Sequence, residues 1–344
     1  MNRYKNAIKS LQLNKLNDIY ISDKILKLLP NKINSNIQKY VVEKKKFCKF
    51  KQLETNSFIS KDIIQDIKIS CTKLSIFKYG KNRIIKIFSS NYDVLEEITK
   101  IDSILNMFDL ILKKENKYKI EIYLSNCKKE LQEGNIIKPK SVNTGSTYPG
   151  HIITLWRKEE VYKVLIHELV HYLFLDIFDY QDEIKYIYDK INLGNKITNP
   201  NEAYTEYVAV ILFIYWYYKT HNFDISLKKF MKRRLIIELG WSFYQIAKIL
   251  KFFKCYKCYQ DLFSTKCIFN QTTNVLSYYI LKTYFLFYSD KFMDCINFNQ
   301  DSERFRCINV IDLNDINFSK IINNNLKNYK LFINDKTMRM TCIG

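Results

Sequence analysis

The stretch VYKVLIHELVHYLFLDIF, residues 161–178, is a nearly continuous apolar run that contains two histidines and two acidic residues. A helix of this composition is apolar on most sides and is therefore expected to be buried. His167 and His171 are four residues apart, so both imidazoles lie on one face of such a helix. Glu168 follows the first histidine. Because burying an unpaired carboxylate is costly, we expect a metal ion and its water to supply the missing partner.

The segment His167-Glu168-Leu169-Val170-His171 is an HExxH motif. Two imidazoles on one helical face can bind one zinc ion, and Glu168 can face the open coordination position. There it would act as general base and accept a proton from the zinc-activated water. The chain has only four His, so the motif rarely arises by chance at this composition. The alternative is a pair of hydrogen-bonded histidines in a buried helix without metal.

Zinc in a catalytic site needs a third protein ligand. The metzincin pattern requires Gly at position 174 and His at position 177, and Phe174 and Ile177 exclude that class. Asp176 is five residues after His171, off the face that the two histidines share, and is not favoured as a ligand. The predicted third ligand is Glu202, which begins a later apolar helix.

Glu202 and Glu206 belong to the segment Asn201-Glu202-Ala203-Tyr204-Thr205-Glu206. Two carboxylates four residues apart on one buried helical face repel each other. The pair becomes favourable if Glu202 binds zinc and Glu206 accepts a hydrogen bond from a zinc-bound histidine, which fixes the tautomer of that ring. The alternative is a helix start after Pro200 that favours acidic residues.

An HExxH motif followed by Asn-Glu-Ala-x-x-Glu resembles the gluzincins, and the second segment is similar to that of thermolysin-like enzymes. The resemblance covers the two helices and implies a zinc metalloprotease with one zinc ion per chain. It implies His167, His171 and Glu202 as ligands, Glu168 as base, and Glu206 as the carboxylate behind a ligand. Glu206 stands where thermolysin-like enzymes have Asp.

In gluzincins a Tyr or His beyond the second motif helps to stabilise the oxyanion. Tyr278 and Tyr279 are the catalytic candidates here, with His221 as an alternative. The 26 Tyr of the chain make a purely structural role the competing interpretation. The Gly-x-Met-x-Asn motif of gluzincin aminopeptidases is absent, so we expect an endopeptidase, and a carboxypeptidase stays open.

The hydrophobic pattern predicts an α+β fold, with a small mixed or antiparallel sheet, an edge strand beside the HExxH helix and a mainly helical C-terminal half. Residues 151–156 are predicted to be that edge strand, which would bind a protein or peptide substrate in extended form by β-augmentation. Residues 126–150 are predicted to be a polar loop that borders the cleft. The other predicted strands are 74–77, 84–88 and 118–124, and the predicted helices are 93–114, 157–179, 182–190, 201–219, 226–254 with a break at Gly240, and 274–288.

Three parts are predicted along the chain. They are a basic helical segment at residues 1–60, a zinc-peptidase-like domain at 61–290 and an extension at 291–344. Nothing in residues 1–16 resembles a signal sequence. The longest uncharged apolar run, 207–218, is shorter than the about 20 residues of a membrane span, so we expect no membrane segment.

We expect an intracellular, cytoplasmic protein with reduced thiols. Cys255, Cys258 and Cys267 lack a fourth nearby ligand for a second zinc site. The segment Arg157-Lys158-Glu159-Glu160 and the Lys-, Asn- and Ile-rich composition also resemble metalloprotease-like proteins of giant DNA viruses, which would place the chain in the host cytoplasm or the virion.

Two other functions stay open. The net charge of +20 suits an anionic partner, but the lysines are spread along the chain without a nucleic-acid-binding motif, so a nucleic-acid role is supported by charge alone. A zinc-stabilised, catalytically degenerate protein-binding module is the other alternative. The presence of Glu168 argues against it, because a purely structural zinc site has no need of a base.

Overall fold

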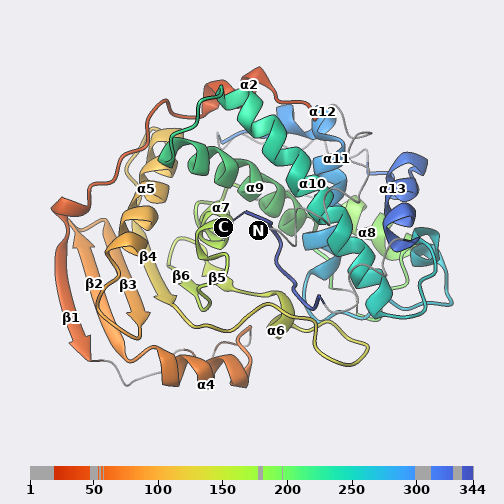
Figure 1. The fold of residues 1–344 in the computed structure, drawn as a ribbon, viewed down its shortest axis with the longest axis horizontal. Helices are drawn as coiled ribbons and strands as arrows, with labels where there is room; N and C mark the ends of the chain where they lie inside the picture. Colours follow the sequence, from red (N-terminus) through yellow and green to blue (C-terminus); the bar gives the residue numbers. More distant parts are fainter. Residues whose placement is uncertain are drawn as a thin grey trace.

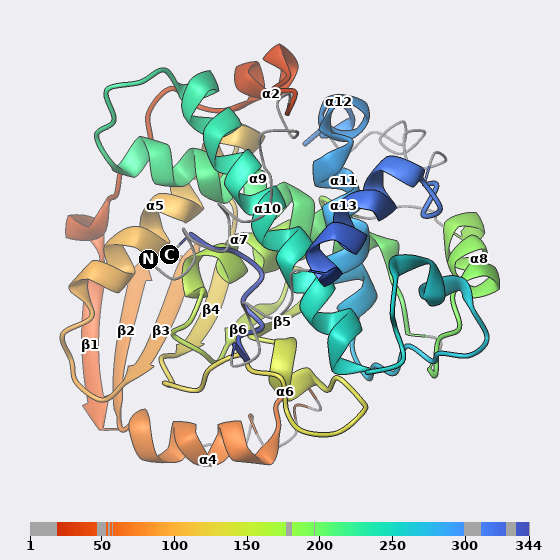
Figure 2. The ribbon, with the colours of Figure 1, turned by 45° about the vertical axis from the view of Figure 1, so that its right-hand side comes forward.

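The computed structural model describes residues 19–46, 53, 56, 58–176, 181–195, 197–298, 311–327 and 335–343. The fold is α+β, as predicted. A mixed six-stranded sheet forms one side of the molecule, and the helices of the C-terminal half form the other (Figure 1). The HExxH helix lies between the two parts in both views (Figure 2).

The sheet has the strand order β1-β2-β3-β4-β6-β5. Strands β3, β4 and β6 are parallel to their neighbours in the centre, whereas β1, β2 and β5 pair antiparallel. Their bounds are β1 Val41–Lys46, β2 Lys73–Tyr79, β3 Arg83–Ser89, β4 Tyr118–Tyr123, β5 Gly145–Tyr148 and β6 Ile152–Leu155. The central strands are buried on both faces, which suits their Ile-rich sequences.

Helices cover both faces of the sheet. On one face, α5 (Leu95–Leu112) and α7 (Val161–Tyr172) pack in the main core with inward residues such as Ile120 and Ile122. On the other face, α4 (Lys61–Ser70) contributes Ile63 and Ile67 to a second buried cluster that includes Trp156. The strand β6 leads directly toward α7, so the sheet fixes the start of the HExxH helix.

The helical half packs around α7. Helix α9 (Pro200–Thr220) packs against α7, and α10 (Leu227–Phe252) packs on α9. The Asn199 side chain caps α9 by accepting from the Asn201 amide, and Pro200 occupies its first turn. The other helices are α2 Asp23–Leu28, η2 Ile37–Lys39, α6 Pro139–Val142, α8 Gln181–Lys190, η3 Tyr259–Phe263, η4 Leu276–Leu281, α11 Lys282–Phe287, α12 Ser289–Phe292, η5 Met293–Cys295 and α13 Ile316–Lys327.

Two predictions about the sheet are wrong. Residues 126–150 are not a continuous loop, because α6 and β5 form within them. The edge strand beside α7 is β5, whereas the expected edge strand at 151–156 is β6, which pairs on both sides. The segment Gly145-Ser146-Thr147-Tyr148 is too polar to show a strand pattern by itself. It becomes a strand because β6 offers it backbone partners.

Three predictions about helices also need correction. Residues 41–46 form β1 instead of a helix, since they pair antiparallel with β2, and residues 1–18 lie outside the described part of the chain. Helix α7 ends at Tyr172 and not near 179, because Phe174 adopts a left-handed φ of 56° that turns the chain. Ile177 lies outside the described residues. Helix α10 continues through Gly240 without a break.

The C-terminal segment, residues 335–343, runs through the middle of the molecule in dark blue (Figures 1 and 2). Its Met338 and Met340 belong to the same buried cluster as Ile19 near the start of the described chain. The division into three parts at 60 and 290 stays a prediction. In the described residues, no helix is long and apolar enough to cross a membrane.

Candidate metal centre and active site

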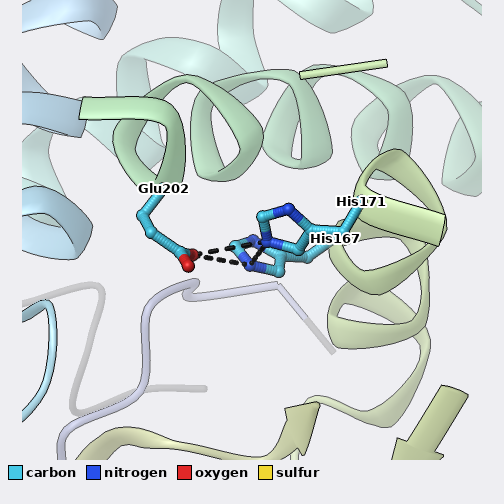
Figure 3. Close-up of side chains that lie close together, drawn as sticks. All are labelled: His167, His171 and Glu202. Atoms are coloured by element: carbon cyan, nitrogen blue, oxygen red, sulfur yellow. Dashed lines mark hydrogen bonds and ion pairs between the residues drawn. The ribbon is translucent and has the colours of Figure 1, made fainter. Parts of the chain in front are cut away.

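Helices α7 and α9 bring three side chains to one point (Figure 3). The Glu202 carboxylate reaches from the first turn of α9 toward the His167 and His171 rings, which project from α7. The two imidazole Nε2 atoms are 3.1 Å apart, and each is 3.4 Å from Glu202 Oε2. In the described part of the chain, this is the one group of three or more His, Cys, Asp or Glu side chains close enough to share a metal.

A carboxylate faces the second nitrogen of each ring. Glu206 Oε2 lies 3.0 Å from His167 Nδ1, and Asp176 Oδ2 lies 2.5 Å from His171 Nδ1. A carboxylate accepts hydrogen bonds, so in the neutral rings each Nδ1 donates and each Nε2 keeps its lone pair. The two lone pairs then point toward the Glu202 oxygen.

This donor set fits a zinc ion. Two Nε2 lone pairs and a carboxylate oxygen at such short range repel one another unless a cation lies between them. Tetrahedral zinc with ligand bonds of 2.0–2.1 Å places its ligand atoms about 3.3 Å apart, close to the distances here. Glu202 Oε2 is also buried and has no hydrogen-bond partner in the described structure. A metal ion would satisfy it.

Protons compete with a metal for the same atoms. Burial lowers the pKa of His167 and His171, but the facing carboxylates outweigh it and hold the pKa of both rings above the ordinary value. Burial also raises the pKa of Glu202, yet the two histidines reverse this and bring it well below its usual range. Glu202 is therefore a carboxylate, which is the form that binds metal.

The predicted base, Glu168, is held against β5. Thr147 donates a hydrogen bond of 2.7 Å to Glu168 Oε2. A Cβ atom at Gly145 would come within 2.6 Å of Glu168 Oε1, so only glycine leaves room for this carboxylate. Burial raises the pKa of Glu168, partly offset by the two histidines and Thr147. The edge strand thus shapes the surroundings of the base.

Of the two tyrosine candidates, the structure brings only Tyr278 to the site. Tyr278 lies on the π-helix η4, and its ring centroid is 6.0 Å from that of His167. Burial, followed by the nearby Glu202 carboxylate, raises its pKa well above the ordinary value, so its hydroxyl stays protonated. The Tyr279 hydroxyl instead donates to the Met338 carbonyl in the C-terminal segment. Neighbouring residues on a helix project in different directions, which explains why the two side chains reach different partners.

His221 lies away from the centre. It caps the far end of α9, stacks on Tyr217 and is exposed. Cys255, Cys258 and Cys267 are free cysteines and form no metal-binding group among the described residues. The expectation that all thiols are reduced is wrong at Cys295, which is disulfide-bonded.

Three contacts at the site are absent from the sequence predictions. Asp176 was set aside as lying off the histidine face, but the helix ends at Tyr172 and the turn at Phe174 brings Asp176 back to His171. Lys163 forms a buried ion pair with Glu206. Its position four residues before His167, as a lone cation in an apolar helix, was an available signal. Thr147 gave no signal, because its contact depends on β5.

No protein-family model, curated protein sequence or solved structure matches this chain. The function of the site is therefore inferred from its geometry and from the HExxH motif.

Proposed function

We propose that this chain is a zinc-dependent peptidase, with one zinc ion held by His167, His171 and Glu202. The observation that supports this most is the convergence of three metal-ligand atoms, two of them on rings whose other nitrogen is fixed by a carboxylate. Such partners orient the rings and strengthen them as ligands. The presence of Glu168 next to His167, in the lining of the same pocket, favours hydrolysis over a structural role.

Zinc bound there would supply a Lewis acid that polarises the scissile carbonyl and lowers the pKa of water. Glu168 accepts the proton from water and passes it to the leaving amine. Its pKa, raised by burial, makes Glu168 a stronger base toward the water proton. The Tyr278 hydroxyl, which stays protonated, would donate a hydrogen bond to the oxyanion, and the closeness of its ring to His167 supports this role.

The substrate would be an extended peptide paired with β5. This strand is last in the sheet order, so one of its edges has no strand partner in the described structure. Thr147 of β5 contacts the base, and a peptide along the same strand would therefore pass close to the metal. Cleavage inside a chain is the expected activity, and carboxypeptidase action stays open.

Metal analysis of the purified protein tests the site. We expect about one zinc per chain, and loss of most of it in His167→Ala. His221→Ala is the matched control, because it removes an exposed histidine away from the centre. A wild-type protein without zinc, or a His167→Ala protein with full zinc content, would refute the assignment.

Glu168→Gln separates the peptidase from a degenerate zinc module. This variant should keep zinc and lose cleavage of a denatured protein substrate by about 1000-fold or more, since it removes the base. Glu133→Gln, at an exposed position, should cleave as the wild type does. Equal cleavage by Glu168→Gln would exclude the mechanism. If neither the wild type nor the control cleaves any protein while both hold zinc, the binding module is correct instead.

A further inference from the structure

A small pocket adjoins the proposed catalytic centre, and it spans about 300 Å³ when the open solvent at its mouth is included. His167, Glu168 and Tyr278 form one part of its wall, and Gly145 of β5 forms another. A peptide held along β5 with its scissile bond at Glu168 would therefore place a side chain at this cavity. The lining also includes Met340 from the C-terminal segment, so residues remote in sequence contribute to this cavity.

Two buried lysines line the same cavity. Lys129 and Lys163 are each about 1% exposed, and each pairs with one carboxylate: Lys129 with Glu160 at 2.8 Å, and Lys163 with Glu206. An ammonium group has three N–H donors. The only other contact of either group in the described structure is a weak one, 3.8 Å from Lys163 Nζ to Met340 Sδ. Each lysine thus has donor capacity left for a ligand.

A third donor lies in the cavity wall. Thr144 is 3% exposed, and its hydroxyl is buried without a hydrogen-bond partner in the described residues. A buried hydroxyl that makes no hydrogen bond loses free energy relative to water. A ligand oxygen in the cavity would recover that loss.

Among the described residues, the donors of this cavity that lack an acceptor belong to Lys129, Lys163 and Thr144. Of its carboxylates, Glu206 accepts from Lys163 and His167, and Glu168 accepts from Thr147 and is reserved for the attacking water in the proposed mechanism. A carboxylate ligand only accepts, whereas an amide brings an NH₂ group that would need an acceptor. The apolar walls formed by Val142, Val164 and Met340 suit the methylene stem of such a ligand.

We propose that this cavity selects an acidic side chain, Asp or Glu, next to the scissile bond of the substrate. The inference rests on the proposed peptidase function and adds its substrate class. Lys129, Lys163 and Thr144 donate to the substrate carboxylate, and Met340 contributes apolar lining.

The first experiment compares peptides that differ only in having Glu, Gln or Leu on either side of the cleaved bond. Wild type should cleave the Glu peptide with a kcat/KM about tenfold or more above the Gln peptide, as expected for a charged hydrogen bond. Thr144→Val, which keeps the shape and removes the hydroxyl, should reduce this ratio several-fold. Ser75→Ala removes another buried, unpartnered hydroxyl away from the cavity and should keep the ratio. A wild-type preference for Gln or Leu overturns the proposal.

The second experiment does not depend on catalysis. Calorimetry compares N-acetylglutamate amide with N-acetylglutamine amide as ligands of wild type and of Thr144→Val. We expect the acid to bind at least about tenfold more tightly than the amide in wild type, and the difference to shrink in the variant. Selective binding of the acid without cleavage of any peptide would support the pocket and reject the peptidase. Cleavage with equal binding of both ligands would reject the pocket alone.

Discussion

Each histidine of the proposed metal site depends on a carboxylate that binds no metal itself. The Glu206 carboxylate contacts the Nδ1 atom of His167, and the Asp176 carboxylate contacts the Nδ1 atom of His171. The two carboxylates are held in place by different partners. Glu206 is paired with Lys163 on α7, whereas Asp176 accepts a second hydrogen bond from Thr205 on α9. Each ring is therefore oriented by contacts that bridge α7 and α9.

Asp176→Asn tests this dependence. The amide has half the acceptor capacity of the carboxylate and no charge, so His171 is less firmly oriented and is a weaker ligand. Zinc affinity, measured by competition with a chromophoric chelator, should fall about 10- to 100-fold. Asp182→Asn, at an exposed position of α8, should leave it unchanged. An unaltered affinity in Asp176→Asn would show that this carboxylate does not support the ligand.

Gly145→Ala tests the room left for the base. The new methyl group would come within 2.6 Å of both Glu168 Oε1 and Leu155 Cδ2, so one of them must move. We expect cleavage to fall at least about tenfold, because a displaced base transfers protons poorly, and stability to fall by about 1–3 kcal/mol. Zinc content should persist. Ser146→Ala on the same strand is the control, and full activity of Gly145→Ala would contradict the expected crowding.

The residues of the motif could be predicted because helical periodicity alone places His167 and His171 together. The partners Asp176, Lys163 and Thr147 could not, since each contact needs a turn, a second helix or a neighbouring strand. The choice between the two tyrosines also depends on tertiary packing. Sequence left Tyr278 and Tyr279 equivalent, and only the packing of η4 distinguishes the one beside His167 from the one beside Met338.

At the scale of elements, strands with clear alternation or Ile-rich runs were predicted correctly, as β2, β3 and β4 demonstrate. Strand β5 was missed because its identity comes from the pairing partner β6. The end of α7 was also missed. The apolar sequence continues beyond Tyr172, and the turn depends on Phe174, a residue that rarely adopts positive φ.

The turn after α7 gives a prediction with a matched pair of variants. Phe174 is 43% exposed and has a φ of 56°, where an L-residue costs about 1–2 kcal/mol relative to glycine. Phe174→Gly and Phe174→Ala both remove the ring, and only glycine also removes the backbone strain. The free energy of unfolding in urea should therefore be about 1 kcal/mol higher for Phe174→Gly than for Phe174→Ala. Equal stability of the two variants would mean that the turn stores no strain.

At the scale of the whole molecule, the C-terminal segment connects the two halves. Its backbone accepts hydrogen bonds from Trp241 and Gln245 on α10, and donates to Glu160 at the start of α7. Lys248 of α10 holds it further, by donating to the Thr337 carbonyl and to Asp335. These contacts explain why a segment that was expected to be an extension is buried beside the site.

Lys248 makes this attachment dependent on pH. Burial lowers its pKa to about 8, although Asp335 partly opposes the shift, whereas the ordinary value is 10.5. Between these values the unfolded chain binds a proton that the folded chain does not, so the stability contributed by this group rises by about 1.4 kcal/mol per pH unit. This gain in the free energy of unfolding is complete above pH 10.5, and it is lost as the pH falls to 8. In urea unfolding at pH 8 and 9.5, wild type should therefore gain stability relative to Lys248→Met, while the half-exposed Lys251→Met should follow wild type. If the free energies of unfolding of wild type and Lys248→Met differ by the same amount at both pH values, Lys248 has the same pKa in the folded and unfolded chain.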